Sequence, residues 1–165
     1  MGNTVIKQYS GGEMITFYTK RRRTKTIKEI FLLWFESCFS FINMHNLYEP
    51  RPKIGAICFF IGSLDSLCQS ISIDDITFAK LTNSIFNKVG FYPQIVSSIV
   101  VNYFGKDQHI EFATQAMKIG GKEFSVWYNS SFLETNSVKK LSILIDEWNL
   151  NPNLLPNEIR LLGIQ

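Results

Sequence analysis

The chain has 165 residues, 45% of them apolar and 14% aromatic, with a formal net charge of +3. This composition excludes intrinsic disorder over most of the chain, and the length favours one domain spanning residues 1–165 with a core of its own. The charge is unevenly spread: six cations fall within residues 20–28, leaving 11 basic and 14 acidic residues elsewhere, which predicts a mildly acidic body with one cationic segment.

Residues 1–19 have the pattern of a β-hairpin. Two runs rich in β-branched and aromatic residues, over 4–10 and 13–19, are separated by Gly11 and Gly12. A tight type I′ turn needs positive φ at both central positions, which glycine adopts without strain. A hairpin alone is marginal in water, so we expect it to pack on the helices or pair with another chain through its free edge.

Residues 20–28 form a basic arm and are the strongest functional cue. Its six cations are Lys20, Arg21, Arg22, Arg23, Lys25 and Lys28. Such a cluster is typical of a surface that binds phosphates of a nucleic acid or head groups of an anionic membrane. No helix-turn-helix, zinc-finger or RNA-recognition motif accompanies it. The alternative is a solvated connection between hairpin and helix.

Residues 26–46 contain the longest apolar run, with apolar residues at helical spacing around nearly the whole circumference. Such a helix needs to be surrounded, so we predict that it is the central helix of a bundle. Glu36, Ser37, Ser40 and Asn43 interrupt the run. Because a spanning helix needs about 20 predominantly apolar residues, membrane insertion is not expected.

The rest of the bundle is expected to end at residue 148. Pro50 and Pro52 predict a short turn, followed by a second helix in which Gly55 and Gly62 allow a neighbour to approach closely. Later helices are expected to start near residue 74, at residue 93 and near residue 107, the first of them ending at Gly90. Glycines at 120 and 121 are interpreted as the end of a fifth helix, before a short turn over 122–128 and a last helix over 137–148.

Residues 149–165 contain two prolines and three asparagines in their first eight residues and include several apolar residues. We predict a C-terminal strap with one helical turn after Pro156. Leu154, Leu155, Ile159 and Leu162 are expected to hold the strap against the body.

The sequence offers few candidates for chemistry. Three cysteines lie in apolar helical stretches without the spacing of a disulfide framework or zinc site. If the first two helices pair about Pro50, Glu36 comes level with Asp65, and two buried carboxylates could share a proton or hold a metal. The favoured interpretation is that Glu36 and Asp65 face solvent or accept hydrogen bonds from Ser and Asn side chains. No catalytic residue, metal site or cofactor is predicted, and an enzyme is the less favoured interpretation.

The fold prediction is a mainly α protein: a compact bundle of six or seven helices over 26–148 around a central apolar helix, with an N-terminal β-hairpin. The favoured function is a non-enzymatic, adaptor-type cytoplasmic protein acting through a protein–protein surface, with itself as a homodimer or with another protein. One alternative is a nucleic-acid-associated regulator using residues 20–28. A second alternative is a small-molecule-binding protein with an apolar aromatic pocket between helices.

Overall fold

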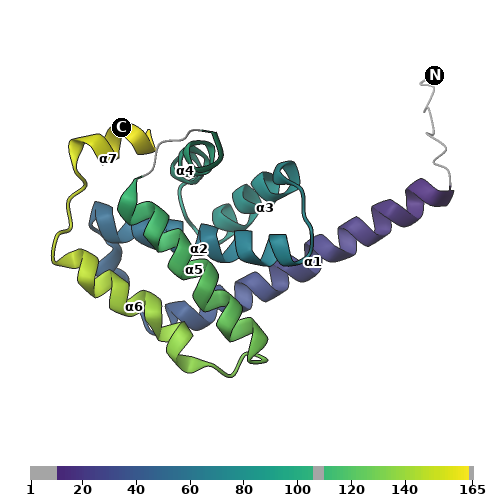
Figure 1. The fold of residues 1–165 in the computed structure, drawn as a ribbon, viewed down its shortest axis with the longest axis horizontal. Helices are drawn as coiled ribbons and strands as arrows, with labels where there is room; N and C mark the ends of the chain where they lie inside the picture. Colours follow the sequence, from purple (N-terminus) through teal and green to yellow (C-terminus); the bar gives the residue numbers. More distant parts are fainter. Residues whose placement is uncertain (1–10, 106–109, 164–165) are drawn as a thin grey trace, which may run out of the picture.

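The computed structural model describes the backbone of residues 11–105 and 110–163, and the side chains of residues 22–101 and 110–163. Within these ranges the chain is mainly helical and compact and has no strand, which confirms the fold class in its coarse form (Figure 1). The elements are α1 (Gly11–Phe39), a 3₁₀ helix η1 (Met44–Leu47), α2 (Pro50–Ser70), α3 (Asp75–Lys88), α4 (Pro93–Gly105), α5 (Glu111–Asn129), α6 (Thr135–Asn149) and α7 (Pro156–Leu162).

The predicted β-hairpin over residues 1–19 is not supported. Residues 11–19, including Gly11, Gly12 and the whole second β-rich run, lie in α1. The first run falls within residues 1–10, outside the described residues. Local β propensity here gives way to continuation of the helix that follows, because β propensity depends on a sheet surface to pack against.

The apolar segment predicted as the central helix over 26–46 is not the centre of the fold. It forms the second half of α1, which ends at Phe39. Four residues later, the side chain of Asn43 accepts a hydrogen bond from the backbone N–H of His45 (3.1 Å) and caps η1. The helix that the others surround is α2, where 14 of 21 residues are buried.

Helices α2 and α5 form the most extensive helix–helix contact, and small residues make it possible. A Cβ on Gly62 would overlap the carbonyl oxygen of Met117, and one on Gly120 would overlap that of Phe59. The prediction that Gly62 allows close approach is therefore confirmed. Interpreting Gly120 as part of a helix end is wrong. It lies within α5, which continues to Asn129, and the backbone of α2 occupies the space that a side chain would need.

A buried hydroxyl ties three helices together at this contact. The indole N–H of Trp34 on α1 donates to Ser63 Oγ on α2 (3.0 Å). Ser63 Oγ also lies 3.0 Å from each of two acceptor carbonyls, those of Phe59 and of Gly120 on α5. The polar atoms of this aromatic core are thus satisfied, as buried polar groups must be.

Three helix ends are closed in the same way, by a backbone N–H that bonds back across the last turn to a carbonyl five residues earlier. These 3.0 Å bonds are Ile73 to Cys68, Phe91 to Phe86 and Phe132 to Trp127. The residue before each donor has positive φ: Ser72 (56°), Gly90 (89°) and Ser131 (57°). The sequence predicted the cap at Gly90. The other two caps were not predicted, because serine occupies a position that is usually glycine.

The C-terminal segment is anchored by Arg51 at the start of α2. Its guanidinium donates to Glu158 Oε2 (2.7 Å) and to the backbone carbonyl of Asn153 (3.1 Å), and lies 4.6 Å from the ring centroid of Phe112. Leu162 is buried. Of the other three strap residues predicted to hold the body, Leu154 is half-buried, whereas Leu155 and Ile159 are exposed (60% and 39%). The tail is therefore held by polar contacts as well as by packing.

Candidate polyanion-binding surface

The predicted basic arm is a stretch of helix. Residues 20–28 lie within α1, at the place where this helix leaves the body, and its N-terminal half runs beyond the other helices (Figure 1). The apolar stripe that holds α1 to the core contains Ile27, Phe31, Trp34 and Cys38, all fully buried. The partly buried Ile30, Phe35 and Phe39 pack against the core beside it. Continued backwards at helical spacing, the stripe meets Thr24 and Lys20, so the apolar contact ends at Ile27.

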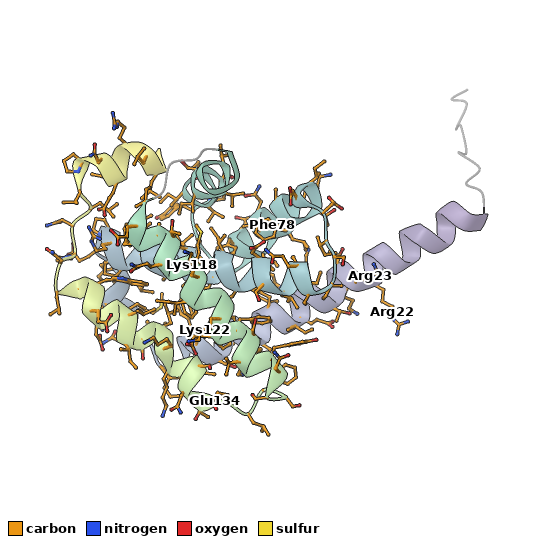
Figure 2. All side chains as sticks on the ribbon, in the orientation of Figure 1. Arg22, Arg23, Phe78, Lys118, Lys122 and Glu134 are labelled. Atoms are coloured by element: carbon orange, nitrogen blue, oxygen red, sulfur yellow. The ribbon has the colours of Figure 1, made fainter. Side chains whose placement is uncertain are left out.

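The described cations of this segment differ in their surroundings. Arg22 and Arg23 are exposed, and Figure 2 shows Arg22 reaching away from the body. Lys25 forms an exposed pair with Glu29 (3.8 Å), and Lys28 Nζ donates to Ser84 Oγ on α3 (3.0 Å). Lys20 and Arg21 belong to the same helix, and their side chains fall outside the described set. Residues 22–30 therefore present four cations and one carboxylate, which we call the cationic segment.

A recess of about 280 Å³ opens at the root of the cationic segment. It is lined by Arg22, Arg23 and Thr26 of α1 and by Ile71, which follows α2. The Thr26 hydroxyl donates to the backbone carbonyl of Arg22 (3.1 Å), which leaves the lone pairs of the oxygen as acceptors. Arg22 and Arg23 both contribute to this lining, and a guanidinium group is a strong donor to a phosphate or carboxylate.

The sequence could locate the two arginines of this recess but not Ile71. Nothing in the residues around position 71 signals a binding role. Its place beside Arg22 follows from the way α2 packs against α1.

No contact between the two carboxylates predicted as a pair, Glu36 and Asp65, is observed in the described part of the chain. Glu36 is exposed on α1, and Asp65 is half-buried on α2, where its side chain accepts from Gln69 (2.7 Å). Burial raises the pKa of Asp65, and the nearby Asp75 carboxylate adds to that rise. On α1, Glu36 lies two residues from the buried Trp34, so it occupies nearly the opposite side of the helix.

Other groups that could carry chemistry are structural. Cys38, Cys58 and Cys68 are buried free thiols, and burial raises the pKa of Cys58 and of Cys68 to about 12. A thiol with so high a pKa stays protonated and is a poor nucleophile. Within the described ranges, no three His, Cys, Asp or Glu side chains gather as metal ligands would.

A second exposed feature lies where α5 turns into α6. Phe132 is 46% exposed with φ of 70°, and Leu133 is 79% exposed. The ring of Phe132 contacts Trp127 (4.7 Å between centroids) and Tyr128 (5.9 Å). Ser130 Oγ accepts from the backbone N–H groups of Leu133 (3.2 Å) and Glu134 (3.0 Å), which holds the turn in place. We call Tyr128, Phe132 and Leu133 the turn surface.

Comparison with protein-family models, curated proteins and solved structures gives no match. Among the described helices, none combines the length and the apolar character needed to cross a membrane. The chemistry of the exposed side chains is therefore the basis for the function proposed below.

Proposed function

We propose that this protein is a non-enzymatic binding protein that associates with nucleic acid through the cationic segment. The observation that carries the proposal is the position of Arg22 and Arg23: both are exposed, adjacent, and placed where α1 leaves the body. Cations held in this way displace the counterions condensed on a phosphate backbone, and the release of those ions drives binding.

Salt dependence of binding tests the proposal directly. Fluorescence anisotropy of a labelled oligonucleotide, repeated over a range of salt concentrations, gives the slope of log K against log[salt]. We expect a negative slope, and we expect the double substitution Arg22→Ala with Arg23→Ala to reduce its magnitude by about 2, because each arginine neutralises about one phosphate.

A matched control removes the same charge elsewhere. Lys118 and Lys122 are exposed on α5, on the body of the molecule (Figure 2). Replacing both by alanine should leave the slope unchanged if the cationic segment binds the phosphates. Equal reductions of the slope in the two double variants would mean that binding reflects net charge alone and would contradict the proposal.

The turn surface favours a second candidate function, the protein–protein contact expected from the sequence. Leu133 is 79% exposed beside two aromatic rings, and clustered exposed apolar side chains are typical of interaction sites. A self-associating protein would lose its dimer on Leu133→Asp, measured by light scattering coupled to size-exclusion chromatography. A monomer for the unmodified chain at micromolar concentration would count against self-association.

A further inference from the structure

The cations of α1 do not form a single stripe. Successive helical residues are about 100° apart, so Arg23 and Lys25 lie about 160° apart around the helix axis with Arg22 between them, while Lys28 faces α3 and donates to Ser84. Arg22 and Arg23 alone point about 100° apart. A ligand that engages Arg22, Arg23 and Lys25 together must therefore offer negative charge on two sides of the helix.

The major groove of B-form DNA has this arrangement. It is about 12 Å wide, a helix with its side chains is about 10–12 Å across, and a phosphate backbone runs along each side of the groove. A helix lying in the groove can use cations on both flanks at once. An anionic membrane is a plane and favours a helix with cations on one face and apolar residues on the other, which residues 22–28 do not have.

Single-stranded nucleic acid fits this surface less well. Proteins that bind single strands stack bases on exposed aromatic side chains. Residues 22–30 contain no aromatic residue, and Phe31, which follows them, is fully buried. Phe17 and Tyr18 precede them on α1, and their side chains fall outside the described ones. Double-stranded RNA is also disfavoured, because its A-form major groove is deep and too narrow for side chains on a helix to enter.

The body leaves room for a duplex. The N-terminal half of α1 extends clear of the other helices, so a groove could enclose it from the side (Figure 1). At the root, the hydrogen bond from Lys28 to Ser84 holds α1 to α3. The recess beside Arg22 and Arg23 would accept the edge of one backbone strand where the duplex reaches the body.

We propose that the partner is double-stranded DNA and that α1 lies in its major groove, with the cationic segment between the two phosphate backbones. This inference rests on the proposed association with nucleic acid. It adds the form of the nucleic acid and the groove that is occupied.

The experiment compares four labelled ligands with the full-length protein at one salt concentration. They are a DNA duplex of about 20 base pairs, or two turns, one strand of that duplex, an RNA duplex of the same length, and anionic phospholipid vesicles. We expect the DNA duplex to bind about tenfold or more tightly than each of the others, since only it engages cations on both flanks. Tighter binding to the single strand, the RNA duplex or vesicles would overturn the inference.

Chemical footprinting locates the groove. Dimethyl sulfate methylates guanine N7 in the major groove and adenine N3 in the minor groove, so protection of N7 on the bound duplex is expected, and protection confined to N3 would overturn the inference. Alanine at both Arg22 and Arg23 should remove the protection, whereas alanine at Lys118 and Lys122 should retain it. Binding to every nucleic acid alike would overturn the duplex inference and leave the proposed function standing, and binding to none would overturn both.

Discussion

Helix α2 buries 14 of its 21 residues, whereas α1, the longer helix, buries only Ile27, Phe31, Trp34 and Cys38 among its described side chains. The two helices differ in charge and in the size of their side chains, since α1 contains nine charged residues and α2 contains three. On α2, Gly55 meets Trp148 and Gly62 meets the backbone of α5. Small residues let neighbours approach α2 on several sides, while α1 offers one apolar stripe and can be covered on one side only.

The largest loss of stability is expected from a substitution at the α2–α5 contact. We expect Gly120→Ala to lower the free energy of unfolding by about 3 kcal/mol, because the new Cβ would overlap the carbonyl oxygen of Phe59 and neither backbone can move without repacking. Urea unfolding measures this difference. In Gly121→Ala the Cβ would lie 3.1 Å from the carbonyl oxygen of Gly62, and the helix propensity of alanine offsets part of the cost. If the two substitutions lower the free energy of unfolding equally, α2 and α5 are not in backbone contact at Gly120.

Removal of the Ser63 hydroxyl should have the next largest effect. Ser63→Ala leaves the buried indole N–H of Trp34 without its acceptor, at a cost of about 2 kcal/mol. Ser142→Ala is the control, since that hydroxyl only donates to the carbonyl of Lys139 on the surface of α6. If the two variants unfold at the same urea concentration, the hydrogen bond between Trp34 and Ser63 contributes nothing to the free energy of unfolding.

An intermediate effect on the free energy of unfolding is expected at Arg51, which holds the C-terminal segment. Arg51→Lys keeps the charge but cannot serve both Glu158 and Asn153 in the same geometry, so we expect a loss of about 1 kcal/mol. Hydrogen exchange should accelerate at residues 150–163 and stay unchanged in α2 and α5. Acceleration throughout the chain would mean that the tail is part of the cooperative core.

A smaller effect, dependent on pH, is expected at Asp65. Because burial raises the pKa of this carboxyl in the folded protein, its ionised form costs stability above the folded pKa, and the cost disappears as the pH falls below the ordinary carboxyl value. Asp65→Asn should therefore stabilise the protein at pH 7 by less than about 1 kcal/mol, given that the group is only half-buried. The gain should vanish in acid. A gain that persists there would have another cause.

The smallest effect on stability is expected where the effect on binding is largest. Alanine at both Arg22 and Arg23 should change the free energy of unfolding by less than about 0.5 kcal/mol, because both side chains are exposed. The same variant should bind nucleic acid more weakly and with a smaller salt dependence. A large drop in stability would show that the cationic segment is part of the fold, and would remove the contrast between α1 and α2.

Predictions from local signals succeeded where the signal acts within a few residues. Pro93 begins α4 and Gly90 has the positive φ of a helix cap, because proline sets φ and glycine tolerates the left-handed region wherever they occur. The same reasoning failed at Gly120, where a partner helix, rather than a turn, requires the missing Cβ. It also failed at Ser72 and Ser131, which take the cap conformation usually given to glycine.

For the candidate site, the sequence identified the cations but not their setting. Residues 20–28 were expected in an arm beside a hairpin, and they lie in a continuous helix. The recess adds Thr26 and Ile71, which no local pattern marks. Glu36 and Asp65 were placed level by counting from Pro50, but that count ignores the direction in which each side chain points.

By itself, the amino-acid sequence determined that the chain is mainly helical, where several helices begin and end, and that positive charge is concentrated in residues 20–28. These properties follow from helical periodicity, backbone restrictions and composition, which are local. Only the tertiary structure decided that α2 is the central helix, that Gly120 lies inside a helix, and that Arg22 and Arg23 flank a recess with Ile71. Each of these depends on which surfaces meet, and the space between two helices is set by the side chains of both.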